Sequence, residues 1–304
     1  MPEWKGKTGG GDKNQGLLIT ILKRVNIRVI YCLLPFVVCY YLIFAPRRAY
    51  SIYSYLRRRQ GFSFFRAAIG TYRNHILFGK FLLDRFYIFA GHRERYKISN
   101  MEKELVEKYF STPKPLVMVS AHVGNFEISS YLCGKLSKKL NVLAFAGETE
   151  QMQKFRTMAM EENNIEIIGV SETMEHIFKI NDAFANSEAL TLTGDRVFTG
   201  RRNQKFNFLG KEAIFPTAIY NMAERYDADL IAMFVLWAGK NFTYKIVVEP
   251  ITIDSSIKGR DARAQAYGQA YVSILEKVVK EYPLQWFNFY NFWRTTGSTD
   301  YEKN

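Results

Sequence analysis

The segment Ser120-Ala-His-Val-Gly-Asn-Phe-Glu127 places a histidine and a carboxylate five residues apart. His122 directly follows an apolar run that predicts a buried strand, and catalytic residues of α/β sheets gather at the carboxyl ends of strands. On one continuous helix the two side chains would point about 140° apart, so they meet only if His122 lies in a turn and Glu127 in the helix that follows. Gly124 and Asn125 supply the turn residues.

Such a pair could perform general base catalysis. A carboxylate at one imidazole nitrogen fixes the tautomer and leaves the other nitrogen to take a proton from a nucleophile. The N-terminus of the following helix would offer backbone N–H groups to an oxyanion. The alternative is a structural pair, in which His122 lies in an ordinary loop and Glu127 caps a helix. The strand before the histidine and the turn after it favour the catalytic interpretation.

The other histidines and the cysteines carry no comparable pattern. His75, His92 and His176 have no partner at a catalytic spacing, and four dispersed histidines predict no metal site. The three cysteines form no Cys-x-x-Cys pair, which excludes a zinc ribbon, a redox motif and a disulfide scaffold.

The elements that would position this chemistry begin near residue 100, where short apolar runs alternate with helical patterns. Strands are predicted over residues 115–120, 142–145, 165–168, 189–193, 230–236 and 242–248. Helices are predicted over residues 125–136, 150–163, 172–184, 215–225 and 261–280. This alternation predicts an α/β fold with a mixed, largely parallel sheet flanked by helices. The aromatic run 286–293 starts with the alternation of a half-buried strand, and it would either close the core or form a membrane-interface belt.

The charge of the chain is concentrated near its start. The formal net charge is +13, yet residues 1–80 hold 14 basic and 2 acidic residues whereas residues 81–304 hold 28 and 27. A basic tail could bind nucleic acid, but this basic quarter surrounds the uncharged run 29–45. The combination points to an anionic membrane surface instead.

The run 29–45 predicts a membrane helix. Its 17 residues span about 25 Å as a helix, slightly less than a hydrocarbon core of about 30 Å, and Pro35 would kink it. A cleaved signal peptide fits poorly, because Arg47 and Arg48 follow the run and no small-residue cleavage site is evident. A buried core helix remains the second alternative.

The segment 122–127 resembles the His-x-Gly-Asn-Trp/Phe-Glu form of the His-x4-Asp/Glu motif of lysophospholipid acyltransferases. It is most similar to the branch of lipid A biosynthesis acyltransferases, the late lauroyl and myristoyl transferases. Three further blocks of that branch follow in order, and the resemblance covers roughly residues 25–296. These blocks are Gly194-Asp195-Arg196, Phe208-Leu-Gly-Lys-Glu-Ala-Ile-Phe-Pro216, and Tyr282-Pro-Leu-Gln-Trp286 with Trp293-Arg-Thr295.

The resemblance implies a glycerolipid acyltransferase-like fold and an acyl-thioester-dependent O-acyltransferase. An acyl group would move from a thioester, on acyl carrier protein or coenzyme A, to a hydroxyl of a lysolipid or partly acylated lipid, such as a lipid A precursor or an amino-acid-containing lipid. No cofactor or metal is implied, and the expected partners are membrane lipids and acyl carrier protein rather than nucleic acid. The implied location is a bacterial inner membrane, with the catalytic domain on its cytoplasmic face.

The resemblance also assigns roles to residues. His122 would be the general base and Glu127 would orient it. The proposed substrate-binding residues are Gly124, Asn125, Asp195, Arg196, Arg201 and Arg202. Among these, Arg196 would face a phosphate or the thioester oxygen, although the Asp195–Arg196 pair could instead be a structural salt bridge. Arg201 and Arg202 would receive an acidic carrier protein, its phosphopantetheine or a lipid headgroup, or else lie in a solvated loop.

The expected organisation is a flexible start (1–16), a membrane-anchoring helix (17–48), a basic aromatic helical segment (49–98) and the acyltransferase domain (99–304). Three positions depart from the family pattern, at Leu284, at Thr217-Ala218 and at Tyr290-Asn291-Phe292, where the family has His-Arg-Arg. The loss of those basic groups argues against a phosphorylated disaccharide acceptor. Two alternatives stay open, a lipid or thioester hydrolase and a non-catalytic, membrane-anchored lipid-binding protein.

Overall fold

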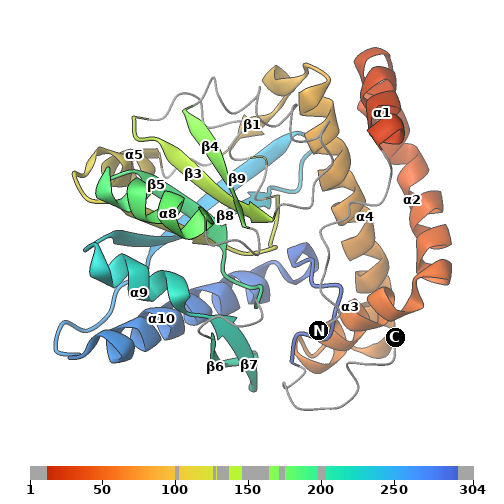
Figure 1. The fold of residues 1–304 in the computed structure, drawn as a ribbon. Coiled ribbons are helices and arrows are strands. Elements are labelled where there is room, and N and C mark those ends of the chain that lie inside the picture. Colours follow the sequence, from red (N-terminus) through yellow and green to blue (C-terminus); the bar gives the residue numbers. More distant parts are fainter. Residues whose placement is uncertain are drawn as a thin grey trace.

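In the part of the chain that the structure describes, the main sheet has seven strands (Figure 1). The computed structural model describes residues 12–99, 103–125, 128, 137–145, 164–170, 175–197 and 203–293. In the described part the strand order is β1-β9-β8-β2-β5-β3-β4, and every pairing is parallel except that of β8 with β9. The strands are β1 (Lys97–Ile98), β2 (Leu116–Ser120), β3 (Leu140–Phe145), β4 (Ile165–Val170), β5 (Ala189–Thr193), β8 (Asp229–Trp237) and β9 (Thr243–Pro250).

The central strand β2 shows why this sheet is buried on both faces. All five of its residues are buried, and alternate residues point to opposite faces. Val117 and Val119 belong to one core cluster, which includes residues of α9 (Ala218–Arg225) and α10 (Arg260–Glu281). Leu116 and Met118 belong to the other, which includes residues of α4 (Phe64–Phe89) and α5 (Lys103–Ser111). The predicted α/β fold with a largely parallel sheet is therefore confirmed.

Most predicted elements agree with the structure within a few residues. The predicted strands correspond to β2, β3, β4, β5, β8 and β9, and the predicted helices near the C-terminal half correspond to α8 (Glu175–Ala185), α9 and α10. The helix predicted over 150–163 lies outside the described residues, as does most of the one predicted over 125–136. The predicted flexible start also lies largely outside them, although α1 (Asp12–Arg24) begins within it.

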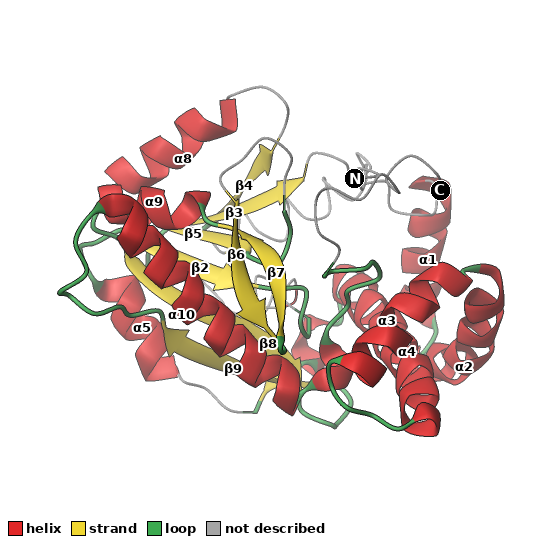
Figure 2. Ribbon diagram, turned by 90° about the horizontal axis from the view of Figure 1, so that it is seen from below, coloured by secondary structure: helices red, strands yellow, loops and turns green. Residues whose placement is uncertain are grey.

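One predicted helix begins too early. Residues 215 and 216 belong to a hairpin of β6 (Asn203–Phe208) and β7 (Lys211–Pro216), and α9 starts only at Ala218 (Figure 2). The turn residues Leu209 and Gly210 both have positive φ, at 52° and 74°, which is the geometry of a two-residue hairpin turn. The sequence pattern Leu-Gly is a weaker turn signal than Asn-Gly, and the hairpin was not predicted from it.

The aromatic run 286–293 is not a strand. It follows the short helical turn η2 (Pro283–Gln285), and of its described residues Trp286 forms an isolated antiparallel bridge with Val123. Trp286, Phe287, Phe292 and Trp293 are buried. The run therefore closes the core, which decides against a membrane-interface belt.

Helices α1, α2 (Ile27–Phe44), α3 (Pro46–Arg58) and α4 lie together beside the sheet, as Figure 1 shows. Local chemistry sets their starts. The side chain of Asn26 caps α2 by accepting from the N–H of Arg28, and Pro46 stands at the first position of α3. Ser63 caps α4 in the same way as Asn26 caps α2.

Helix α2 confirms the helix predicted over the apolar run, and among the described helices it is long and apolar enough to cross a membrane by length and composition. Only Ile27, Leu34 and Val38 of its residues are buried. Its other residues are half-buried or exposed, with Phe36 74% and Ile43 72% accessible. A core helix of a soluble protein would be mostly covered, so the second alternative for this run does not hold.

Candidate active site

The ends of β2 and β5 bring the two central side chains of the site together. These strands are parallel neighbours, and their last residues, Ser120 and Thr193, lie opposite each other. His122 follows β2 by two residues and Asp195 follows β5 by two residues, so both emerge at the same edge of the sheet. This is the carboxyl edge, where α/β proteins commonly bind their ligands.

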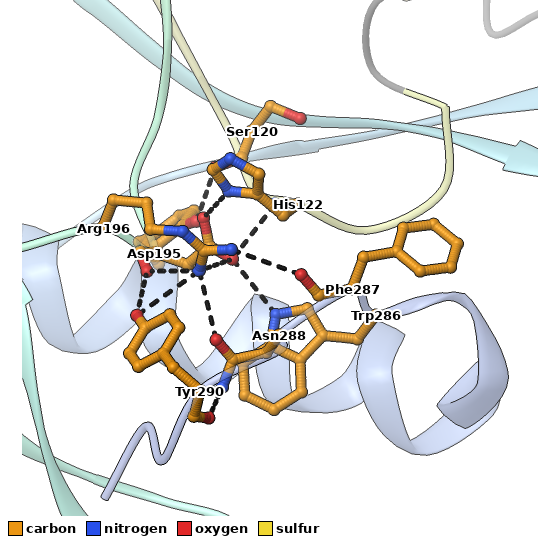
Figure 3. Close-up of polar contacts among 9 residues, drawn as sticks. Ser120, His122, Asp195, Arg196, Trp286, Phe287, Asn288 and Tyr290 are labelled. Carbon is orange, nitrogen blue, oxygen red and sulfur yellow. Dashed lines mark hydrogen bonds and ion pairs between the residues drawn. The ribbon is translucent and has the colours of Figure 1, made fainter. Parts of the chain in front are cut away.

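Asp195 contacts His122 at two points, the imidazole ring and the backbone N–H. Its Oδ1 lies 2.7 Å from Nδ1 of His122, and its Oδ2 accepts the backbone N–H of His122 at 3.1 Å (Figure 3). The indole N–H of Trp286 also donates to Oδ2, at 3.1 Å. Nη1 of Arg196 lies 3.5 Å from the same oxygen, so four donors surround this carboxylate and leave it little freedom to rotate. The orientation of the His122 ring is therefore set by the fold.

The electrostatics of the pair define the tautomer. The side chain of Asp195 is fully buried, and burial by itself raises the pKa of a carboxyl group. The charges of His122 and Arg196 and the hydrogen bonds from His122 and Trp286 outweigh that effect and hold the pKa of Asp195 well below its usual range. Because the ionised carboxylate can only accept, Nδ1 of His122 is the donor, and in the neutral imidazole Nε2 carries the lone pair. The His122 side chain is 25% exposed, which leaves the ring accessible from one side.

Arg196 connects the run 286–293, which we call the closing segment, to the His122–Asp195 pair. Its guanidinium donates to the backbone oxygens of Asp195 and Phe287, both at 3.2 Å, and to Oδ1 of Asn288 at 3.3 Å. It also lies 4.9 Å from the ring centre of Tyr290, whose hydroxyl is 3.4 Å from both the guanidinium and the backbone oxygen of Asp195. The Asp195–Arg196 ion pair is also present, with Nη1 of Arg196 3.5 Å from Oδ2 of Asp195. The contact of Arg196 with a phosphate or a thioester oxygen stays a prediction.

Gly124 has no substitute in the loop after His122. It adopts a φ of +66°, and an added Cβ would lie 2.0 Å from the backbone oxygen of Val235, closer than any real contact. Its N–H donates to the oxygen of Gln285 at 2.8 Å, and the N–H of Phe287 donates to the oxygen of His122 at 2.8 Å. The loop is therefore stitched to β8 on one side and to residues 285–287 on the other.

Asn125 continues this framework. Its N–H donates to the oxygen of Val235 at 2.7 Å, and its side-chain amide donates to the hydroxyl of Tyr244 at 3.2 Å. Gly124 and Asn125 thus have an observed role in shaping the loop, and their predicted contact with substrate remains a prediction.

The structure unites part of the predicted site. His122, Gly124, Asn125, Asp195 and Arg196 lie together at one sheet edge. Glu127, Arg201 and Arg202 lie outside the described residues. Among the described residues no three His, Cys, Asp or Glu side chains gather in a metal-binding group, and the expectation of a metal-free reaction stays a prediction.

The sequence assigns Asp195 to substrate binding but does not pair it with His122, and it gives no role in the site to Trp286. The available signal was that His122 and Asp195 each follow a predicted strand by two residues. That signal becomes a contact only if the two strands are neighbours, which their order along the chain does not reveal.

The family model of bacterial lipid A biosynthesis acyltransferases matches residues 78–295, which is most of the chain. A search of curated proteins gives no matching relative. The matched region contains β2, β5 and the closing segment, and therefore every described residue of the site. Members of this family are acyltransferases, and a histidine held by a buried carboxylate is suited to catalysing acyl transfer. The chain belongs to the bacterial lipid A biosynthesis acyltransferase family.

Proposed function

We propose that this protein transfers a fatty acyl group from an acyl thioester, with acyl carrier protein as the carrier, to a hydroxyl group of a membrane lipid. The observation that carries the proposal is the contact between Nδ1 of His122 and the buried carboxylate of Asp195. It sets the proton on Nδ1 and presents Nε2 as a base at a sheet edge that the family match covers.

The proposed chemistry needs one base and no enzyme nucleophile. Nε2 of His122 takes the proton of the acceptor hydroxyl as its oxygen attacks the thioester carbon, the carbon–sulfur bond breaks, and the imidazolium returns the proton to the leaving thiolate. General base catalysis of this kind contributes about 10²–10⁴-fold. Ser120 is the nearest alternative nucleophile in sequence, but its buried Oγ makes no hydrogen bond within the described part of the chain. A direct transfer is therefore favoured over a seryl intermediate.

Glu127 keeps the orienting role that its motif predicts, next to the role that the geometry supports for Asp195. Two isosteric variants, Glu127→Gln and Asp195→Asn, rank the two carboxylates. If Asp195 is the group that sets the tautomer, Asp195→Asn loses more turnover than Glu127→Gln when initial rates are compared at equal protein levels.

The closing segment supports an acceptor without a phosphorylated sugar at this position. Tyr290 stands within the stretch where the family carries basic groups, and its ring covers Arg196. The guanidinium of Arg196 is hydrogen-bonded to Asn288, Phe287 and Tyr290. It therefore does not replace the basic groups that the family carries at this place. A lysolipid or an amino-acid-containing lipid fits this surface better than a phosphorylated disaccharide.

The N-terminal helices support action at a membrane. The exposed apolar residues of α2 continue at the start of α4, where Phe64 and Phe65 are 60% and 76% accessible. The arginines Arg47, Arg48, Arg57 and Arg58 of α3 lie between these two apolar stretches in the chain. Anionic headgroups beside an apolar layer satisfy both features, and a bacterial inner membrane with the catalytic domain on its cytoplasmic face is the proposed site of action.

The test compares whole lipid extracts by mass spectrometry from cells that express the wild-type protein, His122→Ala or the control His92→Ala. Loss of one acyl chain from a single lipid class in His122→Ala alone supports the transfer and names the acceptor. Free fatty acid without an acylated product would show a hydrolase instead. An unchanged lipid profile, with all three proteins present in the membrane fraction, would overturn the catalytic role and favour a lipid-binding protein.

A further inference from the structure

Asp84 of α4 is a buried carboxylate that the proposed reaction does not use. It is fully buried and accepts three phenolic hydroxyls from three separate parts of the chain. Tyr31 of α2 and Tyr96, which precedes β1, donate to Oδ1, and Tyr244 of β9 donates to Oδ2. The Tyr96 contact measures 2.9 Å. We call Asp84 and these three tyrosines the Asp84 cluster.

Stability alone does not explain the Asp84 cluster, because burying a carboxyl group has a desolvation cost. Burial raises the pKa of Asp84, and the hydrogen bonds from the tyrosines and the nearby charge of Lys80 lower it in part. Buried ionisable side chains can often be replaced by packed apolar ones without loss of stability, so the presence of Asp84 points to a need for a defined arrangement. Lys80 is itself directed elsewhere, since its Nζ donates to Oδ1 of Asn241 at 2.6 Å.

One of the three tyrosines reaches the catalytic loop. The hydroxyl of Tyr244 donates to Asp84 and at the same time accepts from the side-chain amide of Asn125 at 3.2 Å. Burial raises the pKa of Tyr244 well above its usual value, so its hydroxyl keeps the proton that it donates. Asn125 lies three residues after His122 and is tied by its N–H to β8. A continuous line of hydrogen bonds therefore runs from α4 through β9 to the loop that holds the base.

We propose that Asp84 and Tyr244 are positioning residues, which hold the loop 122–125 so that His122 faces its substrate. This inference rests on the proposed acyl transfer. Tyr96 and Tyr31 donate to the same carboxylate, but they belong to the segment before β1 and to α2 rather than to a strand that contacts the loop. Tyr31 also places α2, the proposed membrane helix, on the same carboxylate as the loop.

The chain offers a matched pair for the test. Tyr244→Phe and Tyr96→Phe each remove one hydroxyl from Asp84, but only Tyr244→Phe removes the acceptor of Asn125. The full-length protein in detergent is assayed by thiol release from palmitoyl-acyl carrier protein in the presence of total bacterial lipid. Unfolding midpoints of the same samples give the structural cost of each substitution.

The expected result is a split between the two variants. Tyr244→Phe should lower kcat by about ten- to hundredfold with KM for the thioester nearly unchanged, because small misplacements of a catalytic group have effects of that size. Tyr96→Phe should keep kcat within about threefold at a similar unfolding midpoint. Asn125→Ala should reproduce the loss, and the double variant with Tyr244→Phe should lose little more, since both break one link.

Equal losses of kcat in Tyr244→Phe and Tyr96→Phe, or additive losses in the double variant, would overturn the positioning role. If Tyr244→Phe does not fold, Asn125→Ala takes its place against Tyr96→Phe. The controls separate this failure from that of the proposed function. Thiol release that is equal in the wild type and His122→Ala would end the acyl-transfer proposal, whereas an inactive His122→Ala with no Tyr244 effect would end this inference alone.

Discussion

The sheet and the N-terminal helix α2 differ in how much of their apolar surface is buried. All five residues of β2 are buried because helices cover both faces of the sheet, whereas in the 18-residue helix α2 only three residues are buried. Other parts of the protein therefore cover the apolar residues of β2 on both faces of the sheet. Helix α2 has one stripe packed on α4 and a second apolar stripe without protein against it, which is the surface that a membrane would complete. The difference separates the part of the molecule that carries the candidate active site from the part that we propose contacts lipid.

The largest effect is expected for Asp195→Asn, which removes one negative charge from the candidate active site. Asp195→Asn keeps the shape of the side chain but can donate to Nδ1 of His122, which favours the wrong tautomer for a base at Nε2. We expect turnover to fall by about 10²–10⁴-fold, measured as thiol release from an acyl thioester. Sedimentation with lipid vesicles should stay as in the wild type. A variant that also leaves the membrane would show that the two regions are not separate.

A pair of neighbouring leucines in α2 sharpens the comparison next. Leu34 is buried and packs near Gly79 of α4, whereas Leu33 is 56% exposed. Leu34→Ala should lower the free energy of unfolding by about 2–4 kcal/mol, and Leu33→Ala should change it by less than about 0.5 kcal/mol. Both are measured by denaturant unfolding in detergent.

The same pair should reverse its order on vesicles. Leu33→Ala should weaken binding by about three- to tenfold, because it removes apolar surface that lies in the lipid. Equal vesicle affinity of Leu33→Ala and the wild type would show that the exposed stripe of α2 is not the surface that contacts lipid.

The smallest effect depends on pH. The pKa of Asp195 is lower in the folded protein than the unfolded value of about 3.9, so its stabilising contribution is fully present above that pH and is lost as the pH falls toward the folded value. The difference in unfolding free energy between the wild type and Asp195→Asn should therefore shrink between pH 5 and pH 2. Leu34→Ala carries no titrating group and serves as the control, since its deficit should stay constant over the same range.

Local patterns account for much of the fold. Apolar runs of five to nine residues and helical spacing predict β2, β5, β8 and α10, because a strand or helix buried in a core must present apolar side chains at its own period. The hairpin of β6 and β7 escaped prediction because its turn, Leu209-Gly210, lacks the residues that usually mark positive φ. The alternating aromatic residues of the run 286–293 favour a half-buried strand, yet a segment whose side chains are buried without strand pairing can show the same pattern.

The sequence by itself indicated His122 as the proposed base, the glycine in its loop, the α/β class, and the apolar basic start of the chain. Each of these depends on residue type and on spacing over a few positions. Only the tertiary structure decided that Asp195, 73 positions away, holds Nδ1 of His122, and that Trp286 and Asn125 tie the site to the closing segment and to the Asp84 cluster. Strand order and side-chain packing set these contacts. The physical reason is that residues far apart in the chain come into contact only when the strands that carry them pair with each other in the folded sheet.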